Sequence, residues 1–256
     1  MSYESYARWS TTPLETDPQL SIVIPAFNES ERIVPTIAAL ASSACALGVA
    51  WELIVVDDGS QDGTADLVES FGLVNARVLR AESNGGKGSA VRSGVGAARG
   101  DAILFADADG STPAAALATM LEQLGRGGED VVIASRAGEG AVAANRNPMR
   151  RLMTFGLRVV VRHILGIRVR DTQCGFKLFT RDAARRLFSA QTIEGFSFDL
   201  EILFLASRAR MRVAEVPVHW VDAPGSKVDP AREARKFLRD LVTIRRNAMR
   251  GDYAWA

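Results

Sequence analysis

The sequence has few cysteines, no long uncharged apolar run and no excess of one charge. Its two cysteines, Cys45 and Cys174, lie far apart and outside any Cys-x-x-Cys or Cys/His cluster, so neither a disulfide framework nor a zinc site is indicated. The 31 basic and 30 acidic side chains leave a net charge of +1, which gives no overall field to attract nucleic acid. Nowhere do about 18 uncharged apolar residues run together, the length that a membrane-spanning helix needs. We therefore expect a protein of the reducing cytoplasm that binds no nucleic acid and does not span a bilayer by itself.

The composition is that of a chain with a full hydrophobic core, since 47% of its 256 residues are apolar and 24% are charged. Residues 1–20 are polar and carry Pro13 and Pro18, which indicates a flexible N-terminal arm and not a signal peptide. We expect one α/β domain over residues 21–229, followed by a basic amphipathic helix and tail over residues 230–256.

Short apolar runs alternate with helical patterns along this domain. The expected strands are Ser21–Phe27, Trp51–Asp57, Ala76–Ala81, Ala102–Ala106, Val131–Ser135, Phe176–Thr180 and Arg212–Trp220. The expected helices are Ser30–Ser43, Asp62–Ser70, Lys87–Arg99, Pro113–Leu124, Pro148–Leu165, Asp182–Ala190, Phe198–Ala209 and Pro230–Arg250. Residues Gly138–Asn147 are expected to form a flexible loop. Strands this apolar, joined by helices, predict a mostly parallel sheet covered by helices on both faces.

Polar side chains follow several of these strands at the point where each strand ends. They are Asn28 and Glu29, Asp57 and Asp58, Asp107 and Asp109, and Arg136. In open parallel sheets the ligand site lies beyond the carboxyl ends of the strands. The sequence therefore places a candidate site at this end of the sheet.

The clearest candidate for a metal site is Asp107-Ala108-Asp109, directly after the apolar strand. Two neighbouring carboxylates can share a hard cation such as Mg²⁺ or Mn²⁺, whose remaining positions go to water and substrate phosphates. The alternative is that the pair caps the helix that begins near Pro113.

Two further patterns point to a nucleotide. Asp57-Asp58-Gly59-Ser60 ends a strand, and a carboxylate there can accept hydrogen bonds from a nucleobase or ribose, although an Asx-type turn is the alternative. Asn84–Ser89 is a glycine-rich loop that opens a helix. Its backbone N–H groups and Lys87 are candidates for binding an anion.

In this order, these motifs resemble those of family 2 glycosyltransferases of GT-A (Rossmann-like) fold, from about Ser21 to Lys227. The motifs are Pro25–Glu29, Asp57–Ser60, Gly86–Gly88, Asp107–Asp109, Ser135–Arg136 and Asp171–Phe176. The resemblance is closest to the polyprenyl-phosphate and dolichyl-phosphate glycosyltransferases. It implies a divalent metal, Mg²⁺ or Mn²⁺, at Asp107 and Asp109. It also implies that the nucleotide-sugar is bound by Pro25, Ala26, Asn28, Glu29, Asp57, Gly86, Lys87, Ala108 and Lys227.

Departures within that group bear on the sugar donor. The similar dolichyl-phosphate mannose synthases carry a Gln two residues after the second Asp, where this chain has Ser111. They also carry an Arg just before the Gly-x-Ser-Lys segment near the carboxyl end, whereas this chain has Asp222-Ala-Pro-Gly-Ser226-Lys227. The run Asp171–Phe179 and the short Gly-Ser-Lys segment are similar to the dolichyl-phosphate glucosyltransferases. We therefore expect UDP-glucose as donor, with GDP-mannose as the alternative.

The resemblance also suggests how an acceptor is held. Arg136 and Arg151 match positions that bind the acceptor phosphate in the similar lipid-phosphate enzymes, and an arginine fork suits a phosphate. For Arg151 the alternative is an exposed helix face. Asp199 falls where related enzymes with hydroxyl acceptors hold a base, and in this chain the alternative is that it braces the acceptor loop.

Two basic stretches with apolar faces suggest contact with a membrane. Arg146–Arg170 has seven arginines and no acidic residue, and the C-terminal stretch has apolar residues beside Arg235, Lys236, Arg239, Arg245 and Arg246. Such helices can lie in the interface of an anionic membrane, although an apolar stripe more commonly packs on the sheet. We expect a peripheral protein on the cytoplasmic face of the cell membrane.

The expected activity is inverting transfer of glucose, or a similar hexose, from a UDP-sugar to a polyprenyl phosphate, which gives a β-linked product. Three alternatives stay open: a GDP-mannose donor, a hydroxyl acceptor with Asp199 as base, and a nucleotide-sugar-binding scaffold without turnover.

Overall fold

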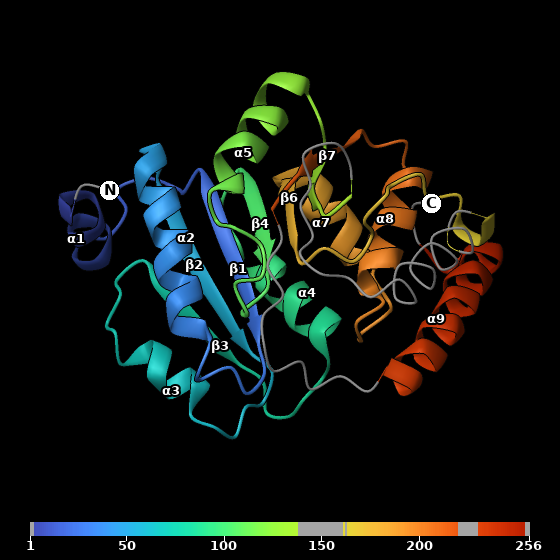
Figure 1. Cartoon of the computed structure of the whole chain (residues 1–256), viewed down its shortest axis with the longest axis horizontal. Helices are drawn as coiled ribbons and strands as arrows, with labels where there is room; N and C mark the ends of the chain where they lie inside the picture. Colours follow the sequence, from blue (N-terminus) through green and yellow to red (C-terminus); the bar gives the residue numbers. More distant parts are fainter. Residues whose placement is uncertain (1–2, 138–160, 162, 220–229, 254–256) are drawn as a thin grey trace.

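A computed structural model describes residues 3–137, 161, 163–219 and 230–253. Its centre is a seven-stranded sheet with the strand order β3-β2-β1-β4-β6-β5-β7 (Figure 1). The strands are β1 (Leu20–Ala26), β2 (Trp51–Asp57), β3 (Ala76–Arg80), β4 (Ala102–Ala106), β5 (Val131–Ser135), β6 (Phe176–Thr180) and β7 (Val213–Pro217). β6 runs antiparallel to β4 and β5, and the other neighbouring strands pair in parallel.

Helices cover both faces of the sheet. They are α1 (Tyr3–Thr11), α2 (Ile33–Leu47), α3 (Thr64–Glu69), α4 (Lys87–Ala97), α5 (Ala116–Gly127), α7 (Arg181–Ser189), α8 (Phe198–Arg208) and α9 (Pro230–Arg250). α2 contacts α1 and α5, whereas α4 packs on β1 and β2 and contacts α7 and α8. α1 and α9 lie at opposite ends of the molecule in Figure 1. None of the helices in the described part of the chain is long and apolar enough to cross a membrane.

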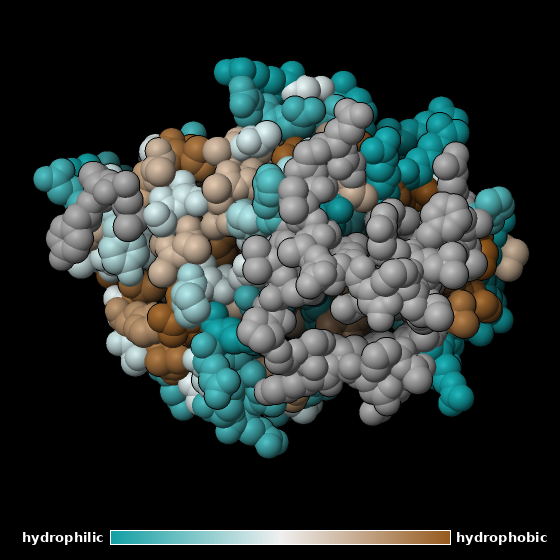
Figure 2. All heavy atoms as spheres, in the orientation of Figure 1, coloured by the Kyte–Doolittle hydropathy of each residue, from teal (hydrophilic) through white to brown (hydrophobic). Residues whose placement is uncertain are grey.

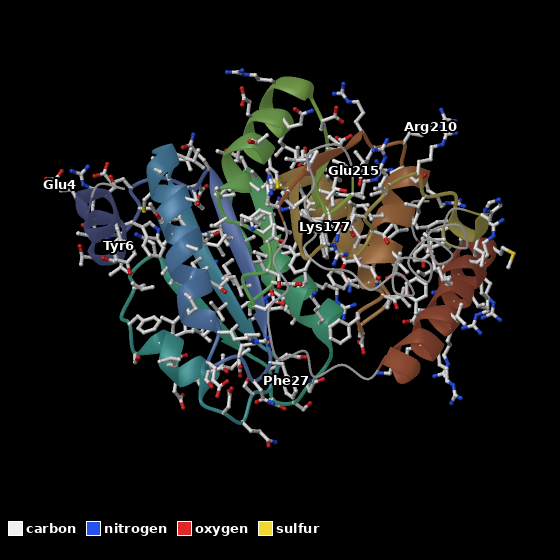
Figure 3. All side chains as sticks on the ribbon, in the orientation of Figure 1. Glu4, Tyr6, Phe27, Lys177, Arg210 and Glu215 are labelled. Atoms are coloured by element: carbon white, nitrogen blue, oxygen red, sulfur yellow. The ribbon has the colours of Figure 1, made fainter. Side chains whose placement is uncertain are left out.

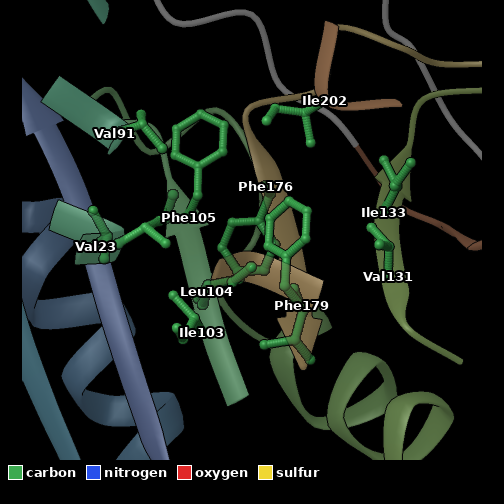
Figure 4. Packing of buried hydrophobic residues seen from close by; sticks show 14 of the residues in the cluster. Val23, Val91, Ile103, Leu104, Phe105, Val131, Ile133, Phe176, Phe179 and Ile202 are labelled. Atoms are coloured by element: carbon green, nitrogen blue, oxygen red, sulfur yellow. The ribbon is translucent and has the colours of Figure 1, made fainter. Parts of the chain in front are cut away.

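The central strands are buried along their whole length, because helices cover them on both sides. Side chains from β1, β4, β5 and β6 meet those of α4 and α8 in one continuous core (Figure 4). Phe105 on β4 packs edge-on against Phe198 on α8, with ring centroids 5.5 Å apart. Burial of this apolar surface stabilises the sheet whose carboxyl end carries the candidate site.

The first residues differ from the expected flexible arm. Residues Tyr3–Thr11 form α1, and the Trp9 ring stacks on Trp51 at a centroid distance of 3.9 Å. The Trp9 indole N–H donates to the Trp51 carbonyl oxygen at 2.8 Å. Sequence periodicity missed this helix because its nine residues hold too few apolar positions to show a pattern.

Most expected strands have the bounds that the sequence indicates, and the ends of the expected helices before α9 differ from the structure by up to a few residues. α2 begins at Ile33, and its N-cap is Arg32 without a capping side chain. The mostly parallel sheet is as expected; the antiparallel direction of β6 was not predicted, because an apolar run looks the same in either direction. The expected loop Gly138–Asn147 and nearly all of the expected helix Pro148–Leu165 lie outside the described residues.

Candidate active site

Hydrogen bonds join the loops that follow β1 and β2. The Asn28 N–H donates to Ser60 Oγ, and the Gln61 N–H donates to Asn28 Oδ1, both at 2.9 Å. The Glu29 N–H donates to Thr64 Oγ1 at 2.9 Å. Asn28 has a left-handed backbone (φ 56°), which asparagine tolerates better than most residues. The two loops therefore form one fixed rim, with Phe27 at the lower edge of Figure 3.

The residues expected around the nucleotide at the end of β1 lie on this rim. Pro25 and Ala26 are buried, and the Ala26 carbonyl accepts from the Asp58 N–H at 2.8 Å. The Glu29 carboxylate accepts two hydrogen bonds from Arg32, from Nε at 2.8 Å and Nη2 at 2.7 Å. In this structure Glu29 is thus oriented by a bidentate ion pair.

Asp57 and Asp58 are both buried at the end of β2, but their partners differ. Asp58 accepts from the N–H groups of Gly85 and Gly86, each at 2.8 Å. Asp57 Oδ2 accepts from the Ser60 N–H at 3.2 Å, which is the Asx-type turn left open by the sequence. Asp57 Oδ1 is buried and has no hydrogen-bond partner among the residues that the structure describes. A buried acceptor of this kind is suited to a donor on a ligand.

Four backbone N–H groups of the glycine-rich loop have partners within the protein. The N–H groups of Gly85 and Gly86 go to Asp58, and those of Gly88 and Ser89 go to the Glu194 carbonyl at 2.7 and 3.2 Å. Gly86 has φ +100°, and a Cβ there would lie 2.5 Å from that carbonyl oxygen. Gly86 therefore shapes the loop, and Lys87 is its remaining candidate for binding a phosphate.

Lys87 at the start of α4 meets Asp107 at the end of β4. The distance from Lys87 Nζ to Asp107 Oδ1 is 2.6 Å, and the side chains are 18% and 29% exposed. The ammonium also lies over the rings of Phe105 and Phe196, 5.2 and 5.7 Å from their centroids. Burial lowers the pKa of Lys87, but Asp107 and Asp199 outweigh it, so the pKa is raised and the group is a cation.

The Asp107–Asp109 turn is held from both sides. The Asp107 N–H donates to the Gly175 carbonyl at 2.8 Å, and Thr36 Oγ1 donates to the Ala108 carbonyl at 2.7 Å. Gly175 packs so closely that a Cβ there would lie 1.8 Å from Asp107 Oδ2. Asp109 Oδ1 accepts from the Ser111 N–H at 2.9 Å.

Both carboxylates line a cavity of about 250 Å³. Its other walls come from α2, the segment before α5, and the start of β6, and include Pro35, Ala39, Leu40, Pro113, Ala114 and Phe176. Asp107 and Asp109 are both partly exposed. Two such carboxylates on one turn fit a hard divalent cation that takes its other ligands from phosphates and water. No group of three or more His, Cys, Asp or Glu residues suited to a metal occurs in the described part of the chain.

Asp199, a candidate base, lies in a buried ion pair instead of facing the cavity. Its side chain is 4% exposed, and Lys177 Nζ, 1% exposed, lies 2.5 Å from its Oδ1. Lys177 also donates to the Cys174 carbonyl at 2.6 Å. Burial raises the pKa of Asp199, and the opposing effect of Lys177 and Lys87 does not cancel it. Through Lys177, Asp199 is linked to the Cys174 carbonyl, next to the Gly175 turn that contacts Asp107.

Sequence reasoning missed Lys177. The signal was present, because it is the one charged residue of the strand Phe176–Thr180, and a lysine in a fully apolar strand needs a buried partner. Lys177 is 1% exposed and is labelled near the middle of the view in Figure 3.

Comparison with known proteins identifies the family of the chain. The model of glycosyl transferase family 2 matches residues 21–188. The chain belongs to this family. Among curated relatives, the dolichyl-phosphate beta-glucosyltransferase of Dictyostelium discoideum is 36% identical over 88% of this chain and 73% of the relative. Those of Homo sapiens and Saccharomyces cerevisiae are 36% and 37% identical, over 93% and 91% of this chain and 77% and 76% of theirs.

Solved structures of similar proteins have the same fold as this chain. Glucosyl-3-phosphoglycerate synthase from Mycobacterium tuberculosis, in complex with phosphoglyceric acid, has a TM-score of 0.67 and is 23% identical, over 89% of this chain and 80% of that chain. A second structure of that enzyme, with Mn²⁺, UDP and glucosyl-3-phosphoglycerate, has a TM-score of 0.65 at 22% identity, over 89% of this chain and 78% of that chain. The chain thus has the GT-A fold expected from its sequence.

In this family 2 glycosyltransferase, Arg136 is anchored by Asp171. The Arg136 Nε and Nη2 atoms each lie 2.7 Å from an Asp171 carboxylate oxygen, and the Arg136 N–H donates to Asp171 Oδ2 at 2.8 Å. Burial raises the pKa of Asp171, but the hydrogen bonds and charge of Arg136 outweigh this effect, so the pKa is lowered. Arg151 and Lys227, the other residues expected at the acceptor and donor, lie outside the described residues.

Proposed function

We propose that this glycosyltransferase transfers glucose from UDP-glucose to a polyprenyl phosphate and forms a β-linked lipid-phosphate sugar. The observation that carries the proposal is its similarity, at 36–41% identity over about nine-tenths of the chain, to relatives named dolichyl-phosphate beta-glucosyltransferase. The site geometry supplies the residues for that reaction.

The donor fits the carboxyl end of β1, β2 and β4. Asp57 Oδ1 is a buried acceptor suited to a uracil N–H. Lys87 is suited to the diphosphate, and Asp107 with Asp109 to Mg²⁺ or Mn²⁺. A bound divalent cation would neutralise the charge that develops on the departing diphosphate. Structural neighbours are described in complex with Mn²⁺ and UDP-glucose or with Mg²⁺ and UDP, which supports this choice over GDP-mannose.

The site suits a phosphate acceptor better than a hydroxyl acceptor. A lipid phosphate is already an anion, so attack on the anomeric carbon needs positioning and charge neutralisation but no strong base. Asp199, which a hydroxyl acceptor would require as base, is buried against Lys177. Attack from the side opposite UDP inverts the anomeric carbon. We propose Arg136 and Arg151 as the groups that face the acceptor phosphate, with Asp171 setting the orientation of Arg136.

We also propose that the enzyme binds the cytoplasmic face of a membrane through α9. Three apolar side chains of this helix, Leu238, Val242 and Met249, are 53%, 63% and 72% exposed. Their spacing of four and seven residues places them on one side of the helix. Arg235, Arg239, Arg245 and Arg246 are exposed beside them. The mixed apolar and polar surface is visible at the right edge of Figure 2. Such a face suits an anionic lipid surface.

A transfer assay with paired donors and acceptors tests the proposal. Labelled UDP-glucose or GDP-mannose is offered with polyprenyl phosphate or with polyprenol, its hydroxyl analogue, in detergent micelles containing Mn²⁺. We expect label in the lipid fraction only from UDP-glucose with the phosphate, and none after Asp109→Asn or chelation, since an amide is a poorer ligand for a hard cation. Transfer from GDP-mannose, or to polyprenol, would support the alternatives. Absence of turnover with intact UDP binding would support the scaffold.

A further inference from the structure

Lys87 pairs with the same carboxylate that the proposed metal needs. Its Nζ lies 2.6 Å from Asp107 Oδ1. A Cβ on Gly175 would lie 1.8 Å from Asp107 Oδ2 and 2.6 Å from Oδ1, so the glycine packs against the whole carboxylate. The Lys87 ammonium therefore pairs with a carboxylate that has little free surface.

An ammonium and a divalent cation cannot both sit at that oxygen without strong repulsion. Like charges a few ångströms apart cost free energy, and the cost grows where the groups are partly removed from water. Lys87 and Asp107 are both largely covered, with 18% and 29% of their side chains exposed. Metal binding therefore has to move Lys87 away from Asp107.

We propose that Lys87 is an exchangeable counter-ion of Asp107. The metal displaces the Lys87 ammonium from Asp107, and the ammonium then binds the diphosphate of the donor, so that metal and nucleotide bind cooperatively. This inference rests on the proposed donor and metal site. Each ligand removes an obstacle for the other: the metal releases Lys87 for the diphosphate, and the diphosphate draws Lys87 away from Asp107. Because such coupling is reciprocal, each ligand raises the affinity of the other by the same factor.

The surrounding contacts confine this exchange to one side chain. Hydrogen bonds from Gly85 and Gly86 to Asp58, and from Gly88 and Ser89 to the Glu194 carbonyl, fix the backbone on both sides of Lys87. The four-carbon stem of a lysine can swing between two nearby anions without backbone movement. The rings of Phe105 and Phe196, both within 6 Å of the ammonium, flank it with faces that tolerate a cation.

Mn²⁺ titration by calorimetry, with and without saturating UDP, tests the exchange in the intact protein. Lys87→Met removes the charge at similar length, and Lys87→Arg keeps it. Arg92→Met is the matched control, because it removes a cation from the same helix whose partners are Glu194 and the Gln191 carbonyl.

We expect Lys87→Met to bind Mn²⁺ more tightly than wild type when UDP is absent, by at least about fivefold, the lower end of typical coupling between two sites. The same variant is expected to bind UDP more weakly, and UDP should raise its Mn²⁺ affinity by a smaller factor than in wild type. Lys87→Arg, which keeps the charge, should bind Mn²⁺ without UDP less tightly than Lys87→Met does, and Arg92→Met should stay near wild type. Unchanged or weaker Mn²⁺ binding by Lys87→Met, in a protein whose wild type binds Mn²⁺ and UDP, would overturn the exchange alone. A folded wild type that binds neither would overturn the proposed function as well.

Discussion

Two lysines meet carboxylates beside β4, and their surroundings assign them different tasks. Lys177 and Asp199 are almost completely buried and lie 2.5 Å apart. Lys87 and Asp107 are partly exposed at the edge of a cavity. A buried pair that cannot reach a ligand holds other groups in place, whereas a partly exposed pair can exchange partners. Lys177 is therefore a positioning residue, because it connects Asp199 to the Cys174 carbonyl and so to the turn beside Asp107.

Removing the charge of Lys177 is expected to lower the free energy of unfolding sharply. Lys177→Met leaves the Asp199 carboxylate buried without its partner, and breaking a buried pair in this way typically costs about 3–5 kcal/mol. Urea unfolding at neutral pH measures the loss. The double variant Lys177→Met/Asp199→Asn should recover part of it, because no charge is then left unpaired. Equal stability of Lys177→Met and wild type would show that the pair does not brace the fold.

The sequence predicted candidate site residues, but not the groups that these residues contact. Asp107 and Asp109 stand out because an apolar strand precedes them, and the structure places them together on a cavity wall. The N–H groups of Gly85 and Gly86 donate to Asp58, and those of Gly88 and Ser89 donate to the Glu194 carbonyl. The contacts with Glu194 could not be predicted, because Glu194 is more than 100 residues away in sequence. Such contacts depend on how distant elements pack.

For helix α9, the sequence pattern predicted the bounds, and the structure adds which of its apolar residues are buried. The expected helix Pro230–Arg250 has those bounds in the structure. Periodicity alone did not separate the apolar residues that pack on the core from those that face solvent. Phe237, Leu241 and Ile244 are buried, whereas Leu238, Val242 and Met249 are exposed.

Acidic substitution on the exposed face of α9 is expected to weaken membrane binding. The double variant Leu238→Glu/Val242→Glu removes apolar contact and adds repulsion from anionic lipid. Sedimentation with vesicles of anionic and zwitterionic lipid should show at least about a tenfold loss, as roughly 1.4 kcal/mol suffices for a factor of ten. Val74→Glu, at another exposed apolar position, is the control and should bind like wild type. Equal vesicle binding by all three proteins would refute the assignment of this face.

Strands were predicted better than short helices. Four strands have the expected bounds because they are largely apolar runs bordered by polar residues. α1 was missed because it is held by contacts with residues distant in sequence, such as the stacking of Trp9 on Trp51 some forty positions later. The direction of β6 was missed because burial on both faces gives parallel and antiparallel strands the same pattern.

For the molecule as a whole, buried carboxylates with lowered pKa values set the response of stability to acid. Burial raises the pKa of Glu52 on β2, but hydrogen bonds from Ser21 and Arg99 and the charge of Arg77 outweigh it, so the pKa lies below its ordinary value of 4.5. Below that value the unfolded chain binds protons that folded Glu52 still rejects. The stabilisation is therefore present above pH 4.5 and is lost as pH falls through the folded pKa.

Glu52→Gln is expected to lower the free energy of unfolding by about 1–3 kcal/mol at pH 7, the usual cost of impairing a buried hydrogen-bonded group. Its stability should then fall less than that of wild type between pH 5 and about 3. Urea unfolding across this range provides the comparison. Glu69→Gln is the control, because that carboxylate pairs with Arg80 in solvent, and it should alter the curve less. A Glu52→Gln curve parallel to that of wild type would contradict the assignment.

We propose that this chain transfers glucose from UDP-glucose to a lipid phosphate with inversion at the anomeric carbon, and the structure of the lipid product is the most direct test. Purified enzyme, UDP-α-glucose, polyprenyl phosphate and Mn²⁺ are incubated, and the lipid product is analysed by proton and phosphorus NMR. We expect glucose joined through its anomeric carbon to the phosphate, in β configuration, because the acceptor attacks opposite the departing UDP. An α-linked product, or glucose joined to a hydroxyl, would contradict it.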